Sequence, residues 1–308
     1  MNCFESSIAK NAGIRYNFFV RKIEYNSPAA LKEFLGANGL GMQKKFGQNF
    51  LINEGARKKI VAALGLEKGA RVWEVGPGLG CMTAELLEGG ANVTAFEIDR
   101  GFISALKDFF SDEIENGSFT LCEGDVLKNW RSAYEERAPQ FLFGNLPYNI
   151  AASFIAQTIE RGARFEKCAF TVQKEVAQRM EAKPSEKDYS SFSVLCQWAY
   201  DVKTICDLGR ANFWPRPNVD SRSVLFTKKA DFPRCKNPEF FVKFQRALFS
   251  NRRKTVKNNL QSFLRSCNSN GNAEEILLAA KVKESARAEE LCVEELLHLS
   301  DFANDAII

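Results

Sequence analysis

The chain contains almost no histidine. Among its 308 residues there is one, His298, close to the C-terminus. Catalysis by a Ser-His-Asp or Cys-His arrangement, and a zinc site built on imidazole ligands, therefore lack their usual parts. The sequence predicts no bound metal, and any chemistry must proceed without a histidine base.

Cysteine is present but shows no pairing pattern. Nine cysteines are scattered without a C-x-x-C spacing, and an odd number cannot all pair within one chain. This pattern is typical of reduced, mostly buried thiols in a cytoplasmic protein. A run of about 18 apolar residues, as a membrane span needs, is also missing, and the first residues lack a signal-peptide core. We therefore expect a cytoplasmic protein without membrane contact.

Acidic residues are scarce in one stretch. Residues 203 to 265 contain fifteen Lys or Arg and four acidic residues, a local balance of +11, while the rest of the chain carries −7. Localised positive charge indicates a polyanion partner, although a solvated basic face is the alternative. We expect the partner to be bound by Arg252, Arg253, Lys254 and Lys257, at the predicted start of a helix.

Apolar strand-like runs alternate with helical patterns from Asn53 onward. Strands are predicted at 71–75, 92–96, 119–122, 141–143 and 169–172, and helices at 53–65, 82–87, 102–110, 153–159 and 175–181. This alternation is typical of an α/β fold with a parallel, doubly wound sheet. Ser27-Pro28 predicts a short earlier helix. A β-rich stretch covers 201–229, and three or four helices follow it.

These patterns divide the chain into three parts. Residues 1–42 form a leader with a short helix, residues 43–230 form the α/β domain, and residues 231–308 form a helical domain. A chain of this length can bury a large core by itself, so we expect a monomer.

A glycine-rich turn, Gly76-Pro77-Gly78-Leu79-Gly80, follows the first α/β strand. A dinucleotide site favours G-x-G-x-x-G, but its third glycine position is Cys81 here. The spacing suits S-adenosylmethionine, which has no phosphate. Glu97 lies at the end of the second strand and Asp125 follows the third, where they can accept hydrogen bonds from a ribose and from an adenine amine respectively. The carboxyl ends of parallel strands meet at one edge of a sheet, so we predict the cofactor site there.

The segment Asn145-Leu146-Pro147-Tyr148 follows a further strand and predicts a pocket for a planar amine such as adenine N6. The Asn145 side-chain carbonyl can accept one N–H. Pro147 stiffens the loop, which lets the carbonyl of Leu146 serve as a second acceptor. Tyr148 would cover the ring. A strand-end turn with a packed aromatic residue is the alternative.

Taken together, these motifs resemble the ribosomal RNA adenine N6,N6-dimethyltransferases, and most closely their bacterial small-subunit (16S) group. The resemblance is carried by residues 46–51, 74–78, 97–100, 144–149, 173–176 and 251–255. It implies a Rossmann-like methyltransferase domain with a small helical RNA-binding domain and S-adenosylmethionine as methyl donor. It also implies dimethylation of two adjacent adenosines in the 3′-terminal hairpin loop of 16S rRNA, within a small ribosomal subunit or its precursor.

The resemblance also assigns residues to roles. Asn49 and Leu51 would close over the cofactor, and Phe213 would stack on the target base beside the unusually large Trp214, so either ring could stack. The implied cofactor-binding set is Asn49, Leu51, Gly76, Gly78, Glu97, Ile98, Asp125, Val126 and Asn145. The implied catalytic set is Asn145, Leu146, Pro147, Tyr148 and Phe213.

Two other functions remain open from the sequence. The antibiotic-resistance dimethylases of 23S RNA share the glycine loop and the Asn-x-Pro-Tyr pocket, but residues 213–221 favour the small-subunit group. A non-catalytic RNA-binding assembly factor would keep the fold, and the presence of Glu97, Asp125 and Asn145 argues against it.

Overall fold

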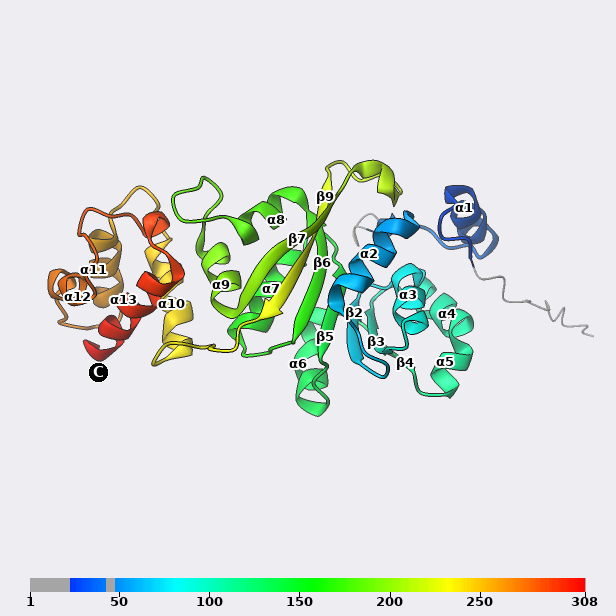
Figure 1. Cartoon of the computed structure of the whole chain (residues 1–308), viewed down its shortest axis with the longest axis horizontal. Helices are drawn as coiled ribbons and strands as arrows, with labels where there is room; N and C mark the ends of the chain where they lie inside the picture. Colours follow the sequence, from blue (N-terminus) through cyan, green and yellow to red (C-terminus); the bar gives the residue numbers. More distant parts are fainter. Residues whose placement is uncertain (1–22, 43–47, 308) are drawn as a thin grey trace, which may run out of the picture.

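A seven-stranded sheet occupies the middle of the molecule (Figure 1). The computed structural model describes residues 23–42 and 48–307. The sheet comprises β2 (Arg71–Val75), β3 (Asn92–Glu97), β4 (Phe119–Glu123), β5 (Phe141–Asn145), β6 (Lys167–Gln173), β7 (Tyr200–Leu208) and β9 (Ser221–Lys228). The predicted leader up to residue 22, and Phe46 and Gly47 of the first motif, lie outside the described residues.

The strand order is β4-β3-β2-β5-β6-β9-β7. The first five strands are parallel, which confirms the predicted α/β sheet, whereas β9 runs antiparallel to both β6 and β7. Between β7 and β9 there is no crossover α-helix, and a connection of this kind joins antiparallel strands. The chain order reverses between β2 and β5, and such a reversal is where open α/β sheets bind ligands.

Helices cover both faces of the sheet. They are α2 (Glu54–Leu64), α3 (Cys81–Glu88), α4 (Arg100–Phe109), α5 (Ser111–Glu115), α6 (Val126–Glu136), α7 (Ala151–Glu160), α8 (Lys174–Glu181) and α9 (Ser191–Ala199). The predicted limits of α2 are confirmed, because the Asn53 side chain accepts from the N–H of Ala56 and Gly65 ends the helix in the left-handed region.

Three of these helices, α5, α6 and α9, were not predicted. Most residues of α9 are buried, so its sequence shows no alternation between an apolar and a polar face. The start of α6 is capped by Asp125, whose carboxylate accepts from the N–H of Leu127 at 3.0 Å. The sequence pattern assigned Asp125 only to cofactor binding, so it did not indicate that Asp125 also caps a helix.

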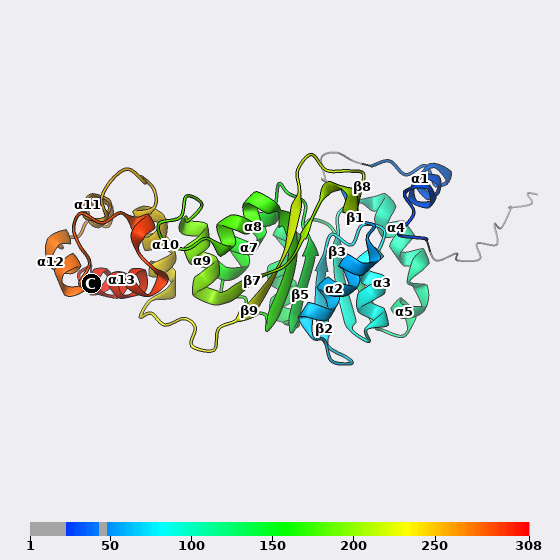
Figure 2. The same cartoon turned by 45° about the horizontal axis from the view of Figure 1, so that its top comes forward.

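The first helix, α1 (Pro28–Ala37), begins at Ser27 as predicted and lies beside α4 (Figure 2). Two short strands, β1 (Phe50–Leu51) and β8 (Phe213–Trp214), pair antiparallel near it. None of the described helices combines the length and apolarity needed to cross a membrane.

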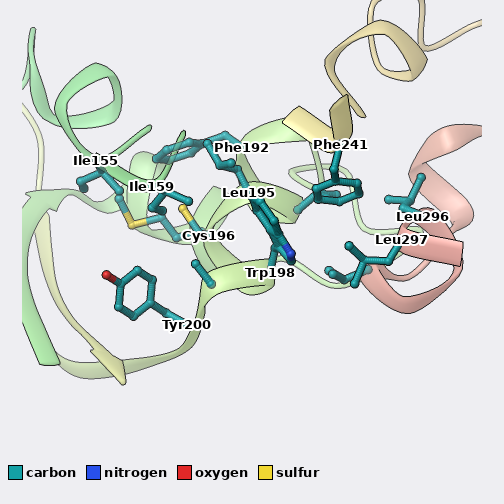
Figure 3. Close-up of a cluster of buried hydrophobic side chains, with 14 of the residues drawn as sticks. Ile155, Ile159, Phe192, Leu195, Cys196, Trp198, Tyr200, Phe241, Leu296 and Leu297 are labelled. Carbon is teal, nitrogen blue, oxygen red and sulfur yellow. The ribbon is translucent and has the colours of Figure 1, made fainter. Parts of the chain in front are cut away.

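The remaining helices gather at the other end of the molecule (Figures 1 and 2). They are α10 (Pro238–Leu248), α11 (Val256–Ser266), α12 (Ala273–Ala279) and α13 (Val293–Asp305). Figure 3 shows Trp198 of α9 between the sheet side of the core and Phe241 of α10. The centroids of the Trp198 and Phe241 rings are 4.8 Å apart, and the Trp198 indole N–H donates to the carbonyl of Pro233 at 2.7 Å. One apolar core therefore runs through both parts, and the division at residue 230 remains a prediction.

Candidate active site

A cavity of about 290 Å³ opens at the carboxyl ends of β2, β3, β4 and β5. A predicted site residue lies at the end of each strand or just after it: Gly76 after β2, Glu97 in β3, Asp125 after β4 and Asn145 in β5. The cavity is also lined by Asn49, Gly78, Ile98, Val126 and Pro147, all of which were predicted. Residues far apart in the sequence thus meet at the switch point of the sheet.

The glycine turn presents main chain to the cavity. Gly76, Gly78 and Gly80 have φ angles of 72°, 59° and 85°, a region that side chains with a Cβ rarely adopt. A Cβ on Gly78 would lie 2.9 Å from Cε1 of Phe50, whose ring packs on the turn and also lines the cavity. The turn therefore needs glycine for its backbone conformation and for the close contact with Phe50.

Glu97 links the two turns that border the cavity. Its Oε2 accepts from the N–H of Gly78 at 3.1 Å, and its Oε1 accepts from the N–H groups of Ile98 and Asp99, both at 2.8 Å. Burial raises the pKa of Glu97 to about 7, while these main-chain donors act in the opposite direction. A carboxylate offers about four acceptor directions. Three of these directions are already used by the main-chain N–H groups. To accept from both ribose hydroxyls, as predicted, Glu97 must therefore lose one of these main-chain hydrogen bonds.

Glu74 of β2 was not predicted as a site residue, although it stands two residues before Gly76. It is 1% exposed and lines the cavity, and its Oε2 accepts from the hydroxyl of Thr83 at 2.7 Å. Burial raises the pKa of Glu74 to about 8, so this carboxyl is mostly uncharged near neutral pH. Phe50 and Gln48 also line the cavity; they belong to the motif at residues 46–51, but no role was predicted for them.

The amide of Asn145 is oriented by a main-chain contact. Its Nδ2 donates to the carbonyl of Asn49 at 2.8 Å, so its side-chain carbonyl is the end that can accept from a ligand. Leu146 is 1% exposed, and its N–H donates to the carbonyl of Thr171 at 3.1 Å. The side chain of Leu146 thus belongs to the core, and its predicted role depends on its carbonyl alone.

Tyr148 is half-buried next to this turn. Its hydroxyl and the Ser221 hydroxyl share a hydrogen bond of 2.8 Å, which fixes the ring against the start of β9. Burial raises the pKa of Tyr148, so the phenol stays protonated.

Of the predicted cofactor-binding and catalytic residues, Leu51, Leu146, Tyr148 and Phe213 do not line the cavity. Leu51 and Phe213 face each other in the β1–β8 pair and are 0% and 1% exposed, because this pairing turns both side chains into the core. The neighbouring rings of Phe50 and Trp214 stack with centroids 6.2 Å apart. Phe50 is therefore the aromatic residue of β1 that reaches the cavity, with Trp214 behind it.

The four predicted RNA-binding residues differ in their surroundings. Arg252 pairs with Glu289 at 2.6 Å, and Lys257 pairs with Glu274 and Glu284. Arg253 and Lys254 are exposed, and within the described part of the chain neither has an acidic partner within 4 Å. Residues 252–254 lie in the turn before α11 rather than in the helix, which begins at Val256.

The charge of the cavity distinguishes between ligand classes. Among the described residues, its lining contains three carboxyl groups, those of Glu74, Glu97 and Asp125, and no Lys or Arg. Such a surface does not neutralise a pyrophosphate, whereas it suits a ligand that carries hydroxyl groups, an amine and a positive charge. The residues fit S-adenosylmethionine. A glycine turn and strand-end carboxylates at the switch point of this sheet define an S-adenosylmethionine-dependent methyltransferase.

Comparison with known proteins identifies the family. The family model described as ribosomal RNA adenine dimethylase matches residues 39–305. Ribosomal RNA small subunit methyltransferase A from Treponema denticola is 49% identical, covering 92% of this chain and 97% of that protein. The protein of the same name from Treponema pallidum is 44% identical, covering 90% and 96%. The chain therefore belongs to the ribosomal RNA adenine dimethylase family, as its motifs predicted.

Solved structures agree with this assignment. A dimethyladenosine transferase from Plasmodium falciparum is 26% identical, with a TM-score of 0.68 over 80% of this chain and 94% of that chain. The 23S rRNA methyltransferase ErmE has a TM-score of 0.61 over 82% of this chain and 99% of that chain, and its 21% identity shows a shared fold.

Proposed function

We propose that this protein transfers methyl groups from S-adenosylmethionine to N6 of two adjacent adenosines in the 3′-terminal hairpin loop of 16S rRNA. The product is N6,N6-dimethyladenosine, formed during small-subunit biogenesis. The observation that carries this proposal is the amide of Asn145, held by the carbonyl of Asn49 at the edge of the cofactor cavity. The names of the Treponema relatives support the small subunit over the large subunit.

Asn145 and Leu146 prepare the target amine for reaction. The lone pair of an adenine amine is delocalised into the ring, and hydrogen bonds from its N–H groups to the two carbonyls favour a pyramidal nitrogen. S-adenosylmethionine supplies an electrophilic methyl group when bound. Holding two reactants in contact lowers a barrier by about 7–11 kcal/mol, so positioning can supply much of the rate. The amine proton leaves after the methyl group arrives, and no histidine base is needed.

Tyr148 offers a ring face to the target base. The base must leave its stack, which costs a few kcal/mol, and stacking on an aromatic ring returns about 1–3 kcal/mol. The Ser221 hydrogen bond holds the Tyr148 ring, so little ordering is needed when the base arrives.

The exposed cations of the C-terminal helical part attract the RNA. Arg253 and Lys254 lie directly before α11, where the main-chain N–H groups of a helix start also favour a phosphate. The substrate is 16S rRNA in a small ribosomal subunit or its precursor, and the enzyme acts as a cytoplasmic monomer.

Methylation of purified ribosomal subunits tests this proposal. Small and large subunits that lack the modification are incubated with the protein and labelled S-adenosylmethionine, and RNA fragments are then analysed by mass spectrometry. The expected product is a 16S fragment with two adjacent dimethyladenosines. Label in 23S RNA would favour the resistance-type alternative. RNA binding without any methyl transfer would instead indicate an assembly factor.

A further inference from the structure

We propose that residues 23–42 brace the two turns that bind the cofactor, and that Tyr25 is a positioning residue for the glycine turn. This inference rests on the proposed use of S-adenosylmethionine. The match to the family model begins at residue 39, so residues 23–38 lie outside it.

The first contact of the brace is with the middle of the glycine turn. The hydroxyl of Tyr25 donates to the carbonyl of Leu79 at 2.9 Å, and Leu79 lies between Gly78 and Gly80. Leu79 is 0% exposed and packs in one apolar cluster with residues of α1, Leu31 and Leu35 among them. A turn with three left-handed glycines has little rigidity of its own. Its central residue is instead held by a segment that precedes it by 54 positions.

The second contact is with the helix that follows the Glu97 turn. Phe34 of α1 packs on Phe109 of α4 with ring centroids 5.1 Å apart. Leu40 lies so close to the first turn of α4 that a Cβ on Gly101 would be 2.5 Å from its Cδ2. The cap of α4 is Asp99, whose N–H donates to the carboxylate of Glu97. The brace therefore packs on the helix whose start orients Glu97.

The third contact anchors the brace to β1. Asn26 accepts from Nη2 of Arg57 at 2.9 Å, and Nη1 of this buried arginine donates to the carbonyl of Leu51 at 3.0 Å. The other residue of β1 is Phe50, whose ring packs on Gly78. The two cofactor turns and the strand beside them are thus joined through residues 23–42. A pre-ordered site binds its ligand more tightly, because less ordering is needed on binding.

Tyr25 can act at any physiological pH. Burial raises the pKa of its phenol well above the ordinary value, so the hydroxyl stays protonated and remains a donor to Leu79. Tyr25→Phe removes this donor and keeps the ring.

A matched pair of variants tests the brace in the full-length protein. Tyr189 also donates its hydroxyl to a main-chain carbonyl, that of Leu291 at 3.0 Å, but it does so in the C-terminal part. Isothermal titration with S-adenosylmethionine should show affinity about three- to tenfold weaker for Tyr25→Phe and unchanged for Tyr189→Phe. In steady-state kinetics, Tyr25→Phe should raise KM for the cofactor and leave kcat near the wild-type value. Tyr25→Ala, which also removes the ring, should lose more affinity.

The outcomes separate this inference from the proposed function. If the wild-type protein binds the cofactor and Tyr25→Phe binds it equally well, the brace is contradicted and the proposed function stands. If both Tyr→Phe variants lose affinity equally, the effect is one of general stability and the positioning role is contradicted. If the wild-type protein does not bind S-adenosylmethionine, both proposals fail together.

Discussion

The cavity and the C-terminal helices handle charge in opposite ways. At the cavity, Glu74 and Glu97 are buried beside glycines, and their pKa values are raised by that burial. At the C-terminal end, Arg253 and Lys254 are exposed in a turn before a helix. The first arrangement suits a reaction on a small ligand and the second suits capture of a long polyanion. The proposed function therefore places its two tasks, methyl transfer and RNA capture, in different parts of the chain.

The largest expected effect is on the rate of methyl transfer, when Asn145 at the edge of the cavity is changed. Asn145→Ala removes the proposed side-chain acceptor for the target amine, and loss of one aligned acceptor typically costs about 10²–10³ in rate. Asn145→Asp keeps an acceptor and should lose less. Single-turnover methylation with saturating cofactor measures the step. Near-wild-type rates for Asn145→Ala would show that the motif is only a structural turn.

A smaller effect is expected for cofactor binding. Glu97→Ala should weaken S-adenosylmethionine binding by about 1.5–3 kcal/mol, the usual range for hydrogen bonds to a charged group. It should also lower the melting temperature, because three main-chain N–H groups lose their acceptor. Glu123→Gln is a control, since Glu123 ends the next strand but is exposed and pairs with Lys107. Calorimetry that finds equal affinities for wild type and Glu97→Ala would remove Glu97 from the site.

The role of the C-terminal cations is tested by the salt dependence of RNA affinity. Neutralising Arg253 and Lys254 together should reduce the slope of log affinity against log salt by roughly 0.7–0.9 for each lost phosphate contact. The matched double change at Arg252 and Lys257 should alter the slope less, because these side chains pair with Glu289, Glu274 and Glu284. RNA binding measured between low and physiological salt decides between them. Equal slopes for the two double variants would contradict the distinction.

A further expected effect concerns stability against pH rather than ligand binding. Glu74 has a pKa of about 8 in the folded protein and an ordinary value of 4.5, so between these values the folded state holds a proton that the unfolded state has lost. The free energy of unfolding should therefore fall as pH rises through this window, by at most about 1.4 kcal/mol per pH unit for one proton. Above about pH 8 the contribution is lost. Urea unfolding of Glu74→Gln should show a shallower fall, and an unchanged slope would contradict the assignment.

The sequence indicated the residues of the cavity more completely than the surroundings of the four predicted RNA-binding residues. Glycine turns, helix caps and strand-end carboxylates have local sequence patterns, so Gly76, Asn53 and Glu97 could be assigned from the residues around them. The pairing of Arg252 with Glu289 spans 37 positions, and nothing in the local sequence indicates it. The burial of Leu51 and Phe213 likewise depends on the β1–β8 pair, which joins distant segments.

One measurement compares the two regions directly. Single-turnover methylation is followed at saturating RNA and cofactor for Asn145→Ala and for the Arg253 and Lys254 double variant, with RNA affinity measured in parallel. The account predicts that the double variant reaches the wild-type rate once RNA is saturating, although it binds RNA more weakly. It predicts that Asn145→Ala binds RNA normally and remains about 100-fold slower or more. Rate and affinity that fall together in both variants would contradict the separation of chemistry from RNA capture.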